Sequence, residues 1–172
     1  MADLNRKSVE EFKQSKKVPL VVVLDNVRSM HNVGSVFRTA DAFLINGIWL
    51  CGYTPRPPHR DINKTALGAT ETVSWQYVAT TMEALDALKQ EGYRVFAVEQ
   101  VEKSIPLQEF SFGDSEKIAV IFGNEVTGVD AEVVKNCDGC IEIPQFGMKH
   151  SLNISVAAGI VLWELTSKSI YG

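Results

Sequence analysis

A regular alternation of short apolar runs and helical segments is the feature that most constrains the fold of this chain. The β-branched run at residues 20–24 predicts a buried strand. Similar signals predict further strands at residues 47–52, 72–78, 93–98, 118–122 and 139–143. Strands that alternate with helices are typical of an α/β domain, whose mainly parallel sheet is flanked by helices. We therefore expect this class, with ligands bound beyond the carboxyl ends of the strands.

Helices are expected between these strands, at residues 8–17, 33–44, 80–90, 130–135 and 151–167. Their expected N-terminal caps include Asn32, Thr80 and Ser151. The last helix is apolar on nearly every side, so it is expected in the core or in a subunit interface. Residues 53–64 contain three prolines and are expected to form a surface loop without regular structure.

Composition excludes several classes of protein. With 45% hydrophobic residues, 22% charged residues and a net charge of −4, the chain has the balance of a soluble globular protein. Its apolar runs fall far short of the ~20 residues that span a bilayer, so we expect no contact with a membrane. The polar N-terminus carries no export signal, which makes the cytoplasm the expected location. One domain is expected at residues 19–172, after a short N-terminal extension at residues 1–18.

The three cysteines are Cys51, Cys137 and Cys140. An odd number in a chain without an export signal favours reduced thiols. Cys137 and Cys140 form a C-x-x-C motif, which is found in redox and zinc sites. Since no second such pair and no histidine at ligand spacing accompany it, packing is the favoured interpretation and no metal is expected.

The loop after the first strand leads into a predicted helix that carries Arg38. Neither a G-x-G-x-x-G motif nor a P-loop is present, which disfavours the common nucleotide-binding enzymes. Side chains in a helix lean toward its N-terminus, so Arg38 is expected to project over Gly34 toward the strand ends. An ordinary surface ion pair between Arg38 and Asp41 is the alternative.

Two further loops follow strand ends. Gly123 and Gly128 bracket a predicted tight turn, in which Glu125 is either functional or simply solvated. In the third loop, Ser151 can cap the last helix and leave backbone N–H groups free for a ligand. Asn153 lies in the first turn of this apolar helix, where its amide needs a specific partner.

Taken together, three segments carry a family resemblance. They read NVGSVFRTA from residue 32, IFGNEVTG from residue 121 and IEIPQFGMKHSLNISVAAG from residue 141. The set closely resembles the three motifs of the SpoU/TrmH-type RNA ribose 2′-O-methyltransferases, in the SPOUT or α/β-knot superfamily. The resemblance, from about residue 20 to 163, implies a C-terminal deep trefoil knot, S-adenosylmethionine bound in the knot and a homodimer. It also implies methyl transfer to a ribose 2′-hydroxyl of tRNA or rRNA, with tRNA slightly favoured.

The resemblance also assigns the site residues. The catalytic set that it implies is Asn32, Arg38, Glu125, Ser151 and Asn153, with Asn124 beside Glu125 in the second motif. The cofactor would lie on the backbone of Gly123, Ile143 and Leu152. In this family the arginine is commonly described as the base. Because a guanidinium is rarely neutral near pH 7, our hypothesis is that Arg38 acts as a fixed cation that stabilises negative charge.

RNA binding requires positive potential, yet the chain is net acidic, so its basic surface must be local. Candidates in the loops around the expected cleft are Arg28, Arg56, Arg60, Lys64 and Lys149. A scatter of solvated charges is the alternative. Two other functions stay open: methylation of a base nitrogen on the same fold, and a non-catalytic RNA-binding or assembly role.

Overall fold

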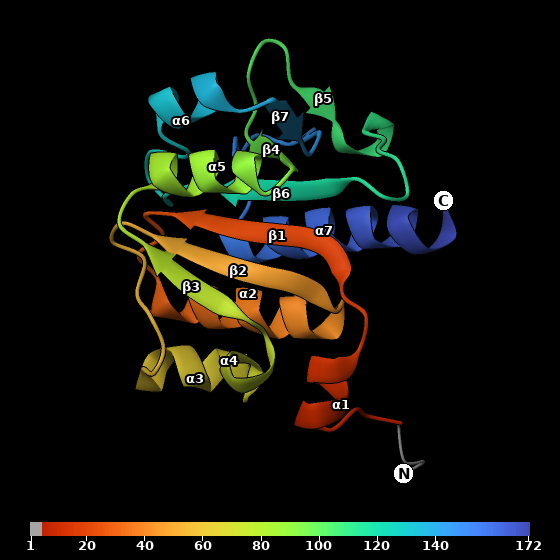
Figure 1. The fold of residues 1–172 in the computed structure, drawn as a ribbon. Coiled ribbons are helices and arrows are strands. Elements are labelled where there is room, and N and C mark those ends of the chain that lie inside the picture. The colour runs from red at the N-terminus through yellow and green to blue at the C-terminus, as the bar shows by residue number, and fades with distance from the viewer. Residues whose placement is uncertain (1–4) are drawn as a thin grey trace.

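The sheet is parallel throughout and has seven strands in the order β3-β2-β1-β6-β4-β7-β5, as seen in the computed structural model, which describes residues 5–172 (Figure 1). This confirms the predicted α/β class, while the trefoil knot stays a prediction. The strands are β1 (Val18–Asp25), β2 (Ile45–Cys51), β3 (Trp75–Val78), β4 (Tyr93–Val98), β5 (Ile105–Pro106), β6 (Lys117–Phe122) and β7 (Gly139–Glu142).

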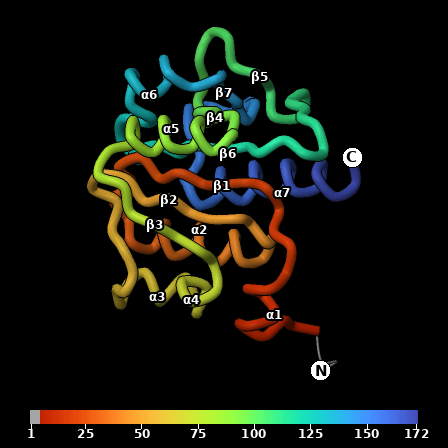
Figure 2. Tube along the Cα trace, viewed as in Figure 1, coloured from red at the N-terminus to blue at the C-terminus, as the bar shows by residue number. Residues whose placement is uncertain are grey.

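Helices cover both faces of the sheet (Figure 2). Successive strand residues point to opposite faces, so Leu20 and Val22 of β1 join one apolar core while Val21 and Val23 join the other. The first core includes side chains of α1 (Val9–Gln14), α2 (Met30–Ala42), α3 (Arg60–Ala66), α4 (Ala69–Thr72), η1 (Leu107–Glu109) and α7 (Ile154–Tyr171). The second core includes side chains of α5 (Thr81–Gln90) and α6 (Ala131–Asn136). The result is a three-layer arrangement of helices, sheet and helices.

Several predicted boundaries are wrong. Helix α2 is capped by Ser29, whose hydroxyl accepts the Asn32 amide at 3.1 Å, so Asn32 lies inside the helix. Helix α7 is capped by Asn153 rather than Ser151. In both places several short polar residues stand in a row and each can cap, so periodicity does not identify which one does.

The proline-rich stretch at residues 53–64 is only partly a loop. Helix α3 begins at Arg60, after the last proline, because the His59 ring accepts the Asp61 amide at 3.1 Å and caps the helix. The strand expected at residues 72–78 is shortened to β3 by the end of α4 at Thr72. The short elements β5 and η1 were not predicted.

The N-terminal extension contributes to the domain core. Ser8 and Glu11 form a capping box at the start of α1, and Phe12 is buried against the first core. The first four residues of the predicted extension lie outside the described part of the chain.

The cysteines are free thiols, and burial raises the pKa of both Cys51 and Cys137 to about 12. Burial also raises the pKa of Cys140. Thiols with such high pKa values stay protonated near pH 7 and are poor nucleophiles. The favoured interpretation of the C-x-x-C motif as packing is consistent with this environment.

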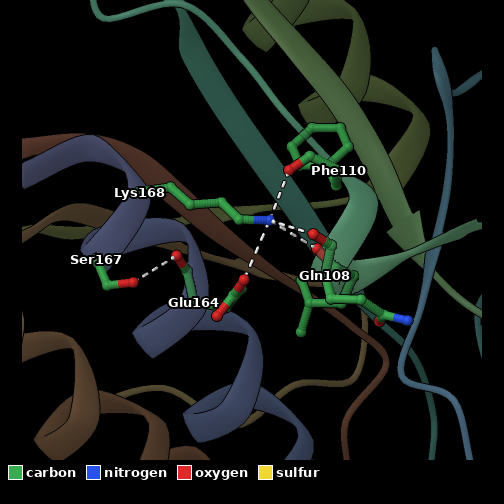
Figure 3. A network of polar contacts seen from close by, with 6 residues as sticks. Gln108, Phe110, Glu164, Ser167 and Lys168 are labelled. Atoms are coloured by element: carbon green, nitrogen blue, oxygen red, sulfur yellow. Dashed lines mark hydrogen bonds and ion pairs between the residues drawn. The ribbon is translucent and has the colours of Figure 1, made fainter. Parts of the chain in front are cut away.

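A lysine fastens the C-terminal half of α7 to the segment around η1 (Figure 3). Lys168 Nζ donates hydrogen bonds to the carbonyl oxygens of Leu107, Gln108 and Phe110 at 3.0, 3.1 and 2.7 Å. It also forms an ion pair with Glu164 at 3.1 Å. The Leu107 carbonyl also accepts the Phe110 amide at 3.2 Å, whereas no other donor is described for the Gln108 and Phe110 carbonyls, so the ammonium group of Lys168 holds α7 in place against the sheet edge.

We expect Lys168→Met to lower the free energy of unfolding by roughly 1–3 kcal/mol, because hydrogen bonds to a charged group are lost and carbonyl groups are left unpaired. Methionine keeps the length and apolar stem of the side chain. Chemical denaturation measures the change, with Lys103→Met at an exposed loop position as the control. Equal loss of stability in both variants would contradict this account of Lys168.

Candidate cofactor and substrate site

A cavity of about 460 Å³ lies at the carboxyl ends of β4, β6 and β7. Its walls are the segments that follow these three strands, together with the start of α7. The lining includes Val98, Glu99, Gln100, Phe122, Gly123, Asn124, Glu125, Glu142, Ile143, His150, Ser151, Leu152 and Asn153. This is the edge of a parallel sheet at which ligands are expected to bind.

The turn after β6 requires its glycines. Asn124 and Gly128 exchange backbone hydrogen bonds at 3.0 and 2.8 Å, and Gly128 has a φ of 71°. A Cβ at position 123 would overlap the carbonyl carbon of Gly128 and the amide nitrogen of Val129. The backbone of Gly123 therefore lies directly against the far side of the turn, and both predicted tight-turn glycines are needed there.

Glu125 fastens the loop after β1 to the loop after β6. Its two carboxylate oxygens accept the backbone amides of Arg28 and Ser29, each at 3.1 Å. Beside it, the Asn124 side chain donates to the carbonyl oxygen of Asn26 at 2.8 Å. Burial disfavours the charged carboxylate, but hydrogen bonds from backbone amides and from the Asn32 side chain outweigh it and lower the pKa of Glu125. The carboxylate is thus held ionised, and both of its oxygens accept amides of the protein's own backbone.

The pKa of Glu125 predicts an effect of acid on stability. Because this pKa is lowered by folding, the carboxylate's contribution is complete above its ordinary value of 4.5 and is lost as the pH falls through the folded-state pKa. Between about pH 5 and pH 3, the free energy of unfolding should therefore fall more steeply in the wild type than in Glu125→Gln. Denaturation at several pH values measures both slopes; identical slopes would show that Glu125 contributes nothing.

The third motif meets the first one at Asn153. Its side-chain oxygen accepts the Ser155 amide at 2.9 Å, and its amide group donates to the Asn32 side chain at 3.4 Å. The polar partner expected for Asn153 is therefore supplied within the protein. Ser151 is exposed and lines the cavity beside Leu152, on the stretch that leads into α7.

Arg38 and Asn32 are the catalytic candidates that do not line the cavity, although Asn32 contacts Asn153 in its wall. The Arg38 side chain is exposed on α2 and does not line the cavity wall. The expected path over Gly34 is wrong, since a Cβ at Gly34 would overlap Thr65 and the carbonyl of Ile62, so α3 fills this space. Within residues 5–172 Arg38 forms no ion pair, and Asp41 accepts a hydrogen bond from a threonine instead. Arg38 is thus left exposed on α2 without an acidic partner in the described part of the chain.

The charged side chains that line the cavity in the described part of the chain are all acidic. Glu99, Glu125 and Glu142 line it, and within the described part of the chain no lysine or arginine does. One oxygen of Glu99 also accepts the Val129 amide at 2.6 Å, which holds the turn after β6. Glu99 and Gln100 were missed by the sequence analysis, although they directly follow a strand whose carboxyl end lies at the same sheet edge. Such a wall suits a ligand that carries positive charge and apolar surface.

Comparison with known proteins identifies the family. Residues 19–163 match the family described as "SpoU rRNA Methylase family". The chain belongs to this family. It is 33% identical to the tRNA (guanosine(18)-2′-O)-methyltransferase of Thermus thermophilus over 94% of this chain and 81% of that protein. It is 32% identical to the 23S rRNA (guanosine-2′-O-)-methyltransferase RlmB of Acinetobacter baylyi, over 94% of this chain and 64% of that protein.

The structure also resembles that of a solved rRNA methyltransferase. The AdoMet-bound rRNA methyltransferase of Sinorhizobium meliloti is 27% identical, with a TM-score of 0.81, and the match covers 97% of this chain and 62% of that one. The fold predicted from the three motifs is therefore that of the SpoU enzymes, and the family predicted from them is confirmed.

The candidate basic residues of this SpoU family member lie on several loops and on α3. Arg28 is exposed beside Glu125, and Arg56 lies over the ring of Tyr77 at 4.1 Å. Arg60 and Lys64 both pair with Asp61, at 3.9 and 3.1 Å. Lys149 is exposed in the loop before α7.

Within residues 5–172 no group of three or more His, Cys, Asp or Glu side chains is arranged to hold a metal ion. In the same part of the chain, none of the helices combines the length and apolar character needed to cross a bilayer.

Proposed function

We propose that this protein is an S-adenosylmethionine-dependent methyltransferase that acts on a ribose 2′-hydroxyl of tRNA or rRNA. The observation that carries the proposal is the cavity at the carboxyl ends of β4, β6 and β7, whose walls hold the second and third motifs of the SpoU family. The AdoMet-bound relative supports the cofactor, and the names of the relatives support methylation of RNA ribose.

The residues of the cavity suit S-adenosylmethionine. A volume of about 460 Å³ falls in the usual range for small-molecule sites. Backbone groups of Gly123, Ile143 and Leu152 would hold the cofactor, while the carboxylates of Glu99 and Glu142 favour its positive charge. When bound, S-adenosylmethionine supplies an electrophilic methyl group on a sulfonium centre.

The protein's part in the reaction is to orient the ribose and to stabilise charge. The proton of the 2′-hydroxyl passes to water as its oxygen attacks the methyl carbon, so negative charge develops on that oxygen. Ser151 and Asn153 are proposed to position the ribose, and Asn32 holds Asn153 from α2. Glu125 acts as a positioning residue, because its carboxylate oxygens already accept two backbone amides. Arg38 is proposed as the fixed cation that binds the neighbouring phosphate and stabilises the developing charge.

A homodimer would bring Arg38 to a position from which it can bind the phosphate next to the target ribose. Exposed apolar side chains at helical spacing form a stripe on α7: Leu152, just before the helix, and Val156, Ile160, Trp163 and Ile170. The ring of Trp163 lies 5.6 Å from that of Phe43, which directly follows α2. Arg38 lies on the exposed face of α2. A second copy of the chain that packs on the α7 stripe would therefore lie near Arg38. Sedimentation equilibrium tests the dimer, which should have twice the 19.0 kDa mass of the chain.

The RNA and the location are parts of the same proposal. Relatives of similar identity act on tRNA and on rRNA, as their names say, so both RNA classes are candidates. The exposed residues Arg28, Arg56 and Lys149, with the partly paired Arg60 and Lys64, would supply the contacts to phosphate. We place the enzyme in the cytoplasm, together with its RNA substrates.

Incubation of the purified protein with methyl-labelled S-adenosylmethionine and separate pools of unmodified tRNA and rRNA tests the function. The expected result is transfer to one pool, with a 2′-O-methyl nucleoside as the labelled product after digestion. A methylated base would support the base-nitrogen alternative. Binding of cofactor and RNA without any transfer would support the non-catalytic role.

A further inference from the structure

A second cavity of about 460 Å³ lies beside the first, at the carboxyl ends of β1, β2 and β3. Its walls come from these strand ends and from the starts of α5 and α6. The buried carboxylate of Asp25 is not available there, since it accepts the Thr81 hydroxyl at 2.6 Å and the Asp130 amide at 3.0 Å. The part of the wall that can receive a ligand is therefore the rim, which contains Tyr53 and Tyr77.

Tyr53 presents its ring to solvent from a fixed backbone. The residue is 81% exposed, which is unusual for an aromatic side chain without a partner. Its amide nevertheless donates to the Asn26 side chain at 2.8 Å. The next residue, Thr54, is buried, and its hydroxyl donates to the Leu24 carbonyl at 3.0 Å and accepts the Val27 amide at 3.1 Å. The backbone that carries the exposed ring is thus fixed before any ligand binds, which reduces the backbone entropy lost on binding.

Tyr77 is a second aromatic residue on the rim, and an arginine is stacked on its ring. The Tyr77 hydroxyl donates to the Gly52 carbonyl at 3.0 Å, which fixes the ring at the end of β3. The guanidinium group of Arg56 lies 4.1 Å from the centre of this ring. Exposed aromatic rings combined with a stacked arginine are the groups on which proteins bind unpaired nucleobases.

The segment from Asn26 to Ser29 separates the two cavities and is bonded to both. Asn26 lines the second cavity, and its carbonyl accepts the side chain of Asn124, which lines the first. The amides of Arg28 and Ser29 bind Glu125, another residue of the first cavity wall. An RNA strand whose target ribose occupies the first cavity would therefore cross exposed Arg28 to reach Tyr53.

We propose that the second cavity binds an unpaired nucleobase of the substrate RNA, close in sequence to the methylated nucleotide, by stacking on Tyr53 beside the Tyr77–Arg56 pair. This inference rests on the proposed RNA methyltransferase function and adds a subsite to it. The subsite takes a base rather than a phosphate, because the charged residues that line the cavity, Asp25 and Asp130, are acidic and the guanidinium group of Arg56 at its edge is stacked on Tyr77.

Binding of unmodified tRNA and rRNA pools to Tyr53→Ala, with S-adenosylhomocysteine present, tests the proposal. Loss of one stacked base should weaken RNA affinity roughly 10-fold in the pool that the wild type binds more tightly. The slope of affinity against salt concentration should stay unchanged, because a base contact releases no counterions. Cofactor affinity should also be unchanged, since Tyr53 does not line the first cavity.

Tyr53→Phe is the matched control, because it keeps the ring and removes only an exposed hydroxyl. It should bind RNA as the wild type does. RNA affinity of Tyr53→Ala within twofold of wild type, or equal weakening in the Phe and Ala variants, would overturn the stacking subsite. Methyl transfer by the wild type is measured in parallel, so that failure of the subsite with transfer intact leaves the proposed function standing.

Discussion

Arg38→Lys is expected to lower the turnover of methyl transfer by about 100-fold or more while leaving the affinity for S-adenosylmethionine within a factor of two. Lysine keeps the positive charge but loses the planar fork of donors that can bind a phosphate and a developing oxyanion together. The cofactor affinity is expected to hold because Arg38 is exposed on α2 and does not line the cavity. Steady-state kinetics and calorimetric titration of the cofactor measure the two quantities.

Arg94→Lys is the matched control for this change, since Arg94 is an exposed arginine paired with Glu116 at 3.1 Å, away from both cavities. It should retain full turnover. Full activity of Arg38→Lys would exclude a role that needs the guanidinium group. Loss of cofactor binding together with turnover would instead indicate that Arg38 supports the fold of the site.

Gly123→Ala is expected to weaken S-adenosylmethionine binding by at least about 10-fold and to lower the free energy of unfolding by about 1–3 kcal/mol. The added methyl group would overlap backbone atoms of Gly128 and Val129, which are not flexible side-chain ends and can move only if the turn opens. The turn forms part of the cavity wall, so its displacement changes the surface on which the cofactor is proposed to lie.

Gly113→Ala provides the comparison, because a Cβ there meets only Glu116 at ordinary contact distances of 3.6 Å or more. It should bind cofactor as the wild type does. Wild-type affinity in Gly123→Ala would show that the cofactor does not depend on this turn, and would place it elsewhere on the protein.

The class of fold was predictable from local patterns, whereas several boundaries were not. Buried strands such as β1 and β6 are continuous apolar runs, which periodicity detects without tertiary information. Helix α3 was missed because the three prolines before it dominate the local signal, and its start depends on a cap by the His59 ring. The two-residue strand β5 is defined by its pairing with β7, which a sequence alone does not display.

The candidate site was predicted where one loop follows one strand, and missed where side chains meet across elements. Glu125 was found from its place after a strand, and Asn153 from its polar amide in the first turn of an apolar helix. The amides that Glu125 accepts, however, come from Arg28 and Ser29, about 96 residues away. Arg38 was directed toward the cavity by helix geometry alone, and α3 blocks that path. The roles proposed for these residues came from the family resemblance and stay predictions.

The central claim is that the methyl group goes to a ribose oxygen, and alkaline hydrolysis of the labelled RNA tests it most directly. Alkali cleaves RNA through attack by the free 2′-hydroxyl on the adjacent phosphate, so a 2′-O-methylated nucleotide stays joined to its 3′ neighbour. We predict that label from methyl-labelled S-adenosylmethionine is recovered in alkali-stable dinucleotides. Recovery of the label in mononucleotides, which would carry the methyl group on the base, would contradict the account.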